Sequence, residues 1–328
     1  MNVMYACDNN FIWLMGISMI SLLENNKKLE TLNIYLLGDN ISDDNKRILN
    51  EIAKKYEREF EVIDVPKIDL PTSLISKRWP LCSLARLYSA TLLPKSIDRI
   101  LYLDSDTIVR GDISELESID FGGNIVLGVK DCISGLYKKN IGLDKHSPYI
   151  NSGVIIFDIN ELRKIDINHE ITNYIDKHKK LINYPDQDII NGIFKERIGL
   201  LSPKYNFMTI EAVHSYKEIV KLRKPTNFYS REEIDEAKKN PTIVHFTTNM
   251  MIIRPWFNQS NHPLASDFDR YFSNSPWKDF VKNEAIFDSK EDKIIKLVMK
   301  FPKPIAYWIL GIMHSVLKPM YIRIKPKK

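Results

Sequence analysis

A chain of 328 residues with 44% hydrophobic and 27% charged side chains has the composition of a globular protein, which excludes disorder as the default. The net charge of +5 is unevenly placed: residues 293–328 carry nine Lys and Arg and no Asp or Glu, whereas residues 1–292 carry 38 basic and 42 acidic side chains. This pattern argues against a nucleic-acid partner and indicates an anionic membrane surface as the partner of the tail.

The cysteines and the N-terminal apolar run set further bounds. Cys7, Cys82 and Cys132 are odd in number, far apart and without CxxC spacing, so neither a disulfide framework nor a zinc site is expected, and the location is expected to be reducing and cytoplasmic. The apolar run 11–23 follows Asp8 without a basic leader and falls short of the ~20 residues that span a bilayer. We therefore expect it to form a buried helix.

Strand-like and helical segments alternate through the first hundred residues. Strands are expected at 2–7, 32–37, 60–65 and 99–103, and helices at 10–24, at 45–56 with Ser42 as a cap, and at 81–93 before Pro94. This rhythm predicts an α/β fold with a mostly parallel sheet covered on both faces. Ligands bind beyond the carboxyl ends of such strands, where Asp8, Asp104 and Asp106 fall.

Fewer elements stand out beyond residue 124. Strands are expected at 125–130 and 153–158, a helix at about 187–194, and a short strand at 244–247 that carries His245. The chain shows no internal repeat, and its one sharp change in composition lies near residue 292.

Asp104 and Asp106 follow the buried strand 100–103 directly and are separated by one residue. Two carboxylates so close repel each other unless a cation lies between them, which favours a hard divalent metal such as Mn²⁺ or Mg²⁺. The alternative is a strand end whose aspartates cap a turn. His245 is by itself either a core histidine or a third metal ligand, because borderline metals accept an imidazole beside carboxylates.

The segment 184–192 combines a proline turn, three polar groups and an apolar helix. Asp186 or Asp188 would ordinarily serve as an N-cap. That interpretation leaves Gln187 without an explanation.

Six segments together resemble glycosyltransferase family 8, most of all its bacterial lipopolysaccharide galactosyltransferases and glucosyltransferases. They occur in the expected order over about residues 1–260: Asp8-Asn9-Asn10, Arg86 within 83–88, Asp104-Ser105-Asp106, 151–154, Asp186-Gln187-Asp188, and His245-Phe246 followed by 254–256. The resemblance implies a GT-A fold with a mostly parallel sheet flanked by helices. It covers a catalytic domain at 1–260. Beyond it we expect a helical extension at 261–292 and, from the composition, a basic, aromatic, membrane-associating tail at 293–328.

The resemblance also implies a reaction and its site residues. The family transfers a hexose from a UDP-sugar with retention of configuration and uses Mn²⁺ (here Mn²⁺ or Mg²⁺), which would be held by Asp104, Asp106 and His245 and would neutralise the leaving diphosphate. The positions matching donor-binding residues are Ala6, Asp8, Asn10, Arg86, Asp104, Ser105, Thr248 and Arg254. The positions around the transferred sugar are Asp131, Asn151, Asp186 and Gln187.

Retention of configuration admits two mechanisms. A covalent intermediate would use a carboxylate such as Asp186, since the amide of Gln187 is a poor nucleophile. We favour front-face attack, with Gln187 stabilising positive charge at the sugar. One segment departs from the family, because Thr248 replaces a glycine and the stretch 249–253 is about three residues longer, which puts the roles of Thr248 and Arg254 in doubt.

The tail from Lys293 mixes basic and aromatic residues around an apolar core, 305–317, of 13 residues. We expect an interfacial segment on anionic lipid at the inner face of the cell membrane, rather than a span. The alternative is a C-terminal helix packed on the catalytic body.

The function that the resemblance implies is hexose transfer, of galactose or glucose, to a cell-surface acceptor such as lipopolysaccharide, capsule or a glycoprotein.

Two other functions compete with this hypothesis. A haloacid-dehalogenase-type phosphatase also has a strand ending in Asp-x-Asp, although usually near the N-terminus. A non-catalytic, membrane-bound sugar-binding or partner subunit of the same fold is the second, made conceivable by the altered segment after His245.

Overall fold

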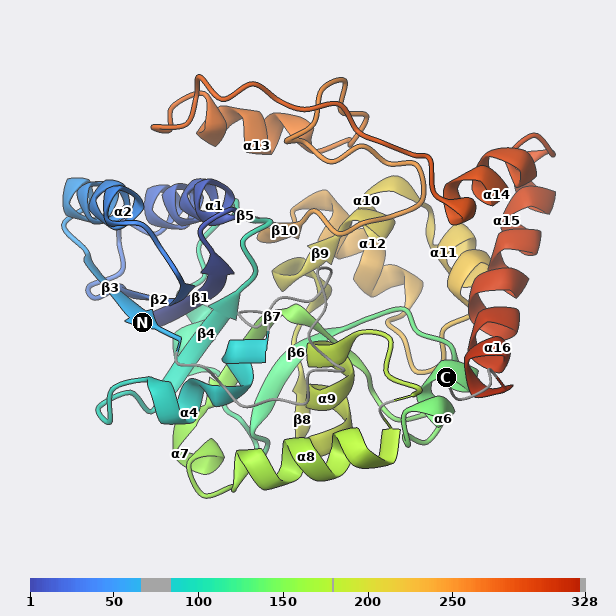
Figure 1. Ribbon diagram of the computed structural model, residues 1–328, viewed down its shortest axis with the longest axis horizontal. Helices are drawn as coiled ribbons and strands as arrows, with labels where there is room; N and C mark the ends of the chain where they lie inside the picture. Colours follow the sequence, from blue (N-terminus) through green and yellow to red (C-terminus); the bar gives the residue numbers. More distant parts are fainter. Residues whose placement is uncertain (66–83, 179, 325–328) are drawn as a thin grey trace.

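A computed structural model describes residues 1–65, 84–178 and 180–324, and it has a central sheet of seven strands in the order β3-β2-β1-β4-β7-β6-β8 (Figure 1). These strands are β1 (Asn2–Asp8), β2 (Asn33–Asp39), β3 (Glu59–Asp64), β4 (Arg99–Leu103), β6 (Val126–Lys130), β7 (Ile150–Asp158) and β8 (Ile198–Leu200). Within this sheet β7 runs antiparallel to β4 and β6, and the other pairs are parallel. The predicted, mostly parallel α/β sheet is confirmed.

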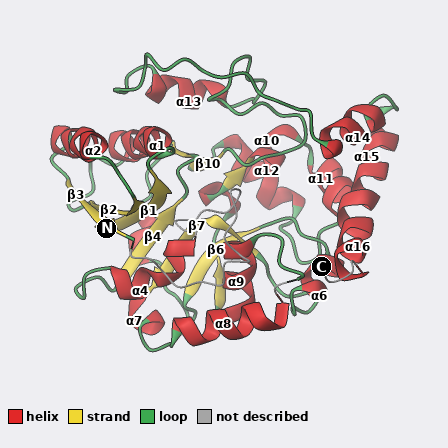
Figure 2. Cartoon of the chain, in the orientation of Figure 1, coloured by secondary structure: helices red, strands yellow, loops and turns green. Residues whose placement is uncertain are grey.

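Helices cover both faces of this sheet, as Figure 2 shows. In β4, Leu101 and Leu103 join one buried cluster, while Ile100 and Tyr102 join the other, because successive side chains of a strand point to opposite faces. The first face is covered by α1 (Ile12–Asn25), α2 (Asp43–Lys55) and α13 (Ala265–Phe272), and the second by α4 (Ser89–Leu92), α7 (Ile159–Leu162), α8 (Ile167–His178) and α9 (Pro185–Ile193). The apolar run 11–23 is thus a buried helix, as predicted.

A second sheet of three strands lies beside the first and was only partly predicted. It pairs β5 (Thr107–Val109), β10 (Ile243–His245) and β9 (Phe207–Met208) in the order β5-β10-β9. Because β5 and β10 are antiparallel with Thr107 opposite His245, their register brings the histidine beside the turn 104–106. β5 and β9 are too short for hydrophobic alternation to reveal them.

Several element boundaries differ from the sequence predictions for local reasons. Helix α1 begins at Ile12 rather than at residue 10, because the Asp8 carboxylate accepts hydrogen bonds from the amides of Asn10 and Phe11 and forms a turn. The Ser42 hydroxyl caps α2 by accepting the Asn45 amide at 3.3 Å. The helix expected at 81–93 is instead a short helical stretch that includes the 3₁₀ turn η1 (86–88) followed by α4, and residues 81–83 lie outside the described residues.

The remaining short helices connect the strands. They are α5 (Glu115–Ser118), α6 (Gly135–Asn140), η2 (Pro203–Tyr205), α10 (Thr209–Val213), α11 (Tyr216–Arg223) and α12 (Arg231–Lys239). Cys7 and Cys132 are buried, whereas Cys82 lies outside the described residues.

The C-terminal segment forms helices α14 (Lys290–Val298) and α15 (Lys303–Ile312), which continues through η3 (Met313–Leu317) into α16 (Lys318–Ile324). One face of α15 packs on α11, so closely that a Cβ at Gly311 would lie 2.0 Å from the Lys221 carbonyl oxygen. The other face is exposed and includes Trp308. The continuous helix 303–324 has the length and apolar composition to cross a membrane, and a third of its most apolar window is buried against the protein. The helix is therefore longer than the 13-residue apolar core that argued against a span.

Candidate functional site

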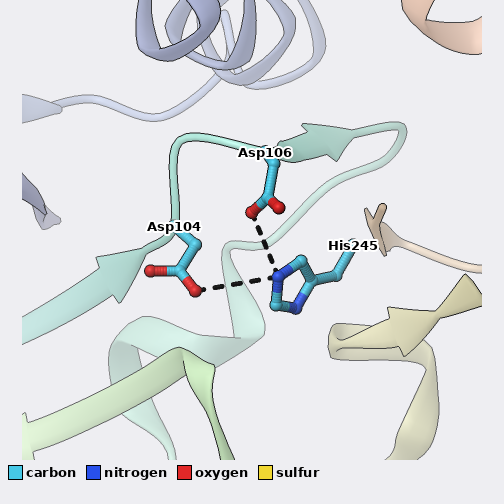
Figure 3. Close-up of side chains that lie close together, drawn as sticks. All are labelled: Asp104, Asp106 and His245. Carbon is cyan, nitrogen blue, oxygen red and sulfur yellow. Dashed lines mark ion pairs between the residues drawn. The ribbon is translucent and has the colours of Figure 1, made fainter. Parts of the chain in front are cut away.

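Asp104, Asp106 and His245 converge at the carboxyl end of β4 (Figure 3), and their nearest ligand atoms all lie within 4.8 Å of one another. The Nε2 atom of His245 is 3.1 Å from an Asp106 oxygen and 3.7 Å from an Asp104 oxygen. Two carboxylates suit Mn²⁺ or Mg²⁺, and the imidazole would add a nitrogen ligand to these oxygens. The structure therefore brings together the three residues that the sequence nominated for metal binding.

The orientation of His245 is set from behind by Asn206, which the sequence analysis missed. The imidazole Nδ1 lies 2.9 Å from the Asn206 side-chain oxygen and donates its proton there, so Nε2 faces the carboxylates. Asn206 in turn donates to the Asn151 side-chain oxygen at 2.9 Å. A buried polar residue directly after the turn 203–205 gave no periodic signal that could have identified it.

Gly153 supplies the space in which these groups meet. A Cβ at this position would lie 2.2 Å from the His245 Cε1 atom and 2.8 Å from an Asp104 oxygen. The amide of Asp104 also donates to the Gly153 carbonyl at 2.8 Å. Only glycine allows β7 to approach the cluster so closely.

Arg86 links the cluster to the start of α9. Its guanidinium lies 2.9 Å from an Asp104 oxygen and 3.4 Å from an Asp186 oxygen, donates to the Ser152 carbonyl at 2.8 Å, and stacks on the Tyr102 ring. Tyr102 donates its hydroxyl to Asp104 at 2.6 Å. Because Arg86 is buried, its charge acts in a region of low dielectric and is compensated by both carboxylates.

The three candidate ligands differ in protonation behaviour. Burial raises the pKa of Asp104 above its usual range, and Arg86 and His245 only partly offset this. Burial also opposes the ionisation of Asp106, but the charges of His245 and Arg254 outweigh it and lower the pKa of Asp106. The two carboxylates raise the pKa of His245 against the effect of its burial. A cation at Nε2 would therefore compete with the proton that the two carboxylates favour there.

Gln187 is fixed by hydrogen bonds at both ends of its amide. Its oxygen accepts from the Asn151 side chain at 3.0 Å and from the Ser152 amide at 3.1 Å, and its nitrogen donates to Asp131 at 3.0 Å. Asp186 accepts the Ser152 hydroxyl at 2.7 Å. The structure therefore joins the four predicted sugar-site residues in one network, although both lone pairs of the Gln187 oxygen already have donors.

Asp188 has a structural environment instead. The buried carboxylate accepts hydroxyls from Tyr137 and Tyr149 at 2.7 and 2.6 Å and amides from Asn183 and Tyr184 at 2.8 and 3.0 Å. Burial raises its pKa to about 6 despite these four donors. Asp188 therefore fixes the backbone just before α9. The N-cap residue is Tyr184 and no side chain caps the helix, so the predicted cap by Asp186 or Asp188 is wrong.

The structure places the predicted nucleotide-binding residues in different environments. Asp8 and Asn10 form the turn at the carboxyl end of β1, whereas the Ala6 side chain is buried in the core. Ser105 lies between the two aspartates and is half-buried. Thr248 is exposed in the loop after His245.

Arg254 reaches the cluster despite the longer segment before it. Its guanidinium lies 4.0 Å from an Asp106 oxygen and stacks on the Trp256 ring, 4.6 Å from the centroid. A second guanidinium therefore lies near Asp106, whereas Arg86 contacts Asp104.

Comparisons with known proteins place this geometry in a family. The family model described as glycosyl transferase family 8 matches residues 2–260. General stress protein A of Bacillus subtilis (strain 168) is 27% identical over 87% of this chain and 97% of its own length, and a lipopolysaccharide 1,2-glucosyltransferase of Escherichia coli is 26% identical over 97% and 91%. The crystal structure of the galactosyltransferase LgtC with donor and acceptor sugar analogues has a TM-score of 0.69 and 22% identity, covering 84% of this chain and 96% of that one. The fold is GT-A, as predicted.

Proposed function

The chain belongs to glycosyltransferase family 8, and on this premise we propose that it is a retaining enzyme that moves galactose or glucose from a UDP-sugar to a cell-surface glycan acceptor, such as lipopolysaccharide, capsule or a glycoprotein. Family membership excludes the haloacid-dehalogenase alternative. The observation that carries the proposal is the cluster of Asp104, Asp106 and His245. It lies at the carboxyl end of a central strand, where mostly parallel sheets bind their ligands. An intact cluster also argues against the non-catalytic alternative.

We propose that Mn²⁺, or Mg²⁺ in its place, binds Asp104, Asp106 and His245. The fit is supported by the short distances within this cluster, by an imidazole whose Nδ1 proton is already engaged by Asn206, and by the space that Gly153 leaves open. When bound, the cation would supply Lewis-acid stabilisation of the diphosphate leaving group.

Other residues would hold the donor around this cation. Arg86 presents its guanidinium beside Asp104 and Arg254 beside Asp106, and such groups form paired hydrogen bonds to phosphate oxygens. We propose that the turn of Asp8 and Asn10, with the backbone of Ala6, binds the uridine. Ser105 and Thr248 complete the proposed donor site.

The transferred sugar would lie against Asp131, Asn151, Asp186 and Gln187. Carboxylates accept hydrogen bonds from sugar hydroxyls, and side-chain amides both accept from them and donate to them. Asp186 is engaged with Arg86 and the Ser152 hydroxyl, which lowers its availability as a nucleophile and supports front-face attack by the acceptor. For the Gln187 oxygen to stabilise positive charge on the sugar, donor binding must release one of its two hydrogen bonds, from Asn151 or from the Ser152 amide.

We propose that residues 293–328 place the enzyme on the inner face of the cell membrane, while residues 1–260 carry catalysis and 261–292 connect the two. Exposed apolar residues on and beside the C-terminal helices, such as Phe301, Trp308 and Met320, stand among the nine basic side chains of this tail. Such a combination binds anionic lipid surfaces.

The test is release of UDP by the purified protein from UDP-galactose and UDP-glucose, with and without Mn²⁺. We expect turnover with one of these donors, dependence on the metal, and loss of activity in Asp106→Ala. Asp279→Ala, which removes an exposed aspartate outside the site, is the matched control. No turnover and no UDP binding by the wild type would favour the non-catalytic alternative.

A further inference from the structure

A largely apolar groove of about 650 Å³ is lined by residues of the C-terminal helices and of α11. These helices lie side by side in Figure 1. Its aliphatic and aromatic walls come from Leu222 of α11, Ile294 and Ile295 of α14, and Leu310 and Tyr321 of the long C-terminal helix. Its volume lies within the range of about 300–1,000 Å³ that small-molecule sites occupy. The groove is separate from the proposed metal site, and none of the residues discussed above as donor or sugar ligands lines it.

The groove nevertheless lies close to the proposed catalytic residues. Two residues of its lining, Met250 and Asn183, are five residues after His245 and four residues before Gln187. Since a chain advances at most ~3.6 Å per residue, the groove comes within about 18 Å of His245 and about 14 Å of Gln187 along the backbone.

A buried polar contact ties the groove to the loop that follows His245. The Tyr307 hydroxyl of α15 lies 3.3 Å from His214 Nδ1, and the other ring nitrogen of His214 lies 3.1 Å from the Asn249 amide nitrogen. His214 therefore connects the C-terminal helix to the loop that leads from His245 to Arg254. The wall of the groove and this loop are thus in contact through buried polar groups.

The charges on the groove are mostly positive. Arg223 contacts the His314 imidazole at 2.5 Å, and Lys318 lies 3.9 Å from Glu291. Arg223 and burial lower the pKa of His314 far below its usual range, so this imidazole adds no charge, and within residues 1–65, 84–178 and 180–324 no ion pair offsets the Arg223 guanidinium. An apolar cavity with a cation of this kind at its wall suits an anionic amphiphile with a hydrocarbon chain.

We propose that this groove binds the hydrocarbon chain of a phosphate-linked glycolipid acceptor, with Arg223 holding the phosphate. The proposal rests on the hexose transfer proposed above. It names the acceptor as a lipid whose sugar lies a short distance from its hydrocarbon chain. The protein would thus bind the lipid part of the acceptor next to the proposed metal site. This contact would add to any contact between the exposed helix faces and the membrane surface.

Binding can be tested with a dansyl-labelled dodecyl phosphate in detergent-free buffer. Ile294 and Leu297 are both exposed residues of α14, but only Ile294 lines the groove. We expect Ile294→Glu to weaken probe binding about tenfold or more and Leu297→Glu to change it less than about twofold. Arg223→Gln should weaken the phosphate probe but not a dansyl-labelled dodecanol. Equal effects of the two Glu variants, or none from either, would overturn the assignment of the groove.

The acceptor is tested with a UDP-hexose labelled in the sugar, incubated with enzyme and a membrane lipid extract. We expect label in the organic phase, reduced in Ile294→Glu but not in Leu297→Glu, while UDP release without acceptor is unchanged in both. Label found only in the aqueous phase, or organic-phase label insensitive to Ile294→Glu despite weakened probe binding, would refute the acceptor proposal. Absence of any UDP release by the wild type would instead refute the transfer function and leave the probe result standing.

Discussion

Replacing Gly153 by alanine should weaken metal binding without unfolding the protein. The added Cβ would lie 2.2 Å from His245 Cε1, so the ring would have to move by about 1.2 Å to reach ordinary contact at 3.4 Å. The ring cannot move freely, because Asn206 holds its Nδ1 at 2.9 Å, and Asp104 on the other side is held by Tyr102 and Arg86. Overpacking of this kind costs about 1–3 kcal/mol.

If that strain is relieved by displacing the ligands, Mn²⁺ affinity should fall about 5- to 150-fold, since each 1.4 kcal/mol is a factor of ten. Isothermal titration with Mn²⁺ measures the change directly. Gly111→Ala is the matched control, because its Cβ would meet only Thr242 at 3.6 Å. Wild-type Mn²⁺ affinity in Gly153→Ala would show that His245 and Asp104 are not held as described.

Three further predictions concern separate parts of the molecule. Asn206→Ala should lower Mn²⁺ affinity about 10- to 100-fold by freeing the His245 ring, and should leave the affinity for anionic vesicles unchanged. Burial raises the pKa of Glu211 to about 8, whereas the unfolded chain loses this proton near 4.5. The free energy of unfolding should therefore fall as pH rises from about 4.5 to 8, by up to ~1.4 kcal/mol per pH unit. Glu211→Gln, which still accepts the Met208 amide, should flatten this pH dependence in urea unfolding. Trp308→Ser should reduce co-sedimentation with anionic vesicles while leaving UDP release unchanged, and unaltered sedimentation would contradict a membrane contact through this face.

The sequence was sufficient for six of the seven strands that the structure describes in the main sheet, because each of these has five or more residues, whereas β8, with three, was not predicted. The run 99–103 reads as a buried strand on its own, and Asp104 and Asp106 follow it without a gap, so their place at a strand end needed no tertiary information. The cap at Ser42 and the buried helix after Asp8 were likewise local patterns.

What the sequence could not provide was the second sheet. The approach of His245 to Asp106 depends on the pairing of β5 with β10, two strands of three residues separated by more than 130 positions. Short strands carry almost no periodicity, and long-range pairing is a property of the folded chain. Asn206 escaped notice for the same reason, since it acts only once β9 and β10 lie side by side.

The most direct test is a crystal structure with Mn²⁺ and UDP, using the anomalous signal of manganese to locate the ion. We predict one strong peak among the carboxylates of Asp104 and Asp106 and the Nε2 atom of His245, in contact with the diphosphate. A peak elsewhere, or bound UDP with no ion between these three side chains, would contradict the proposed metal site.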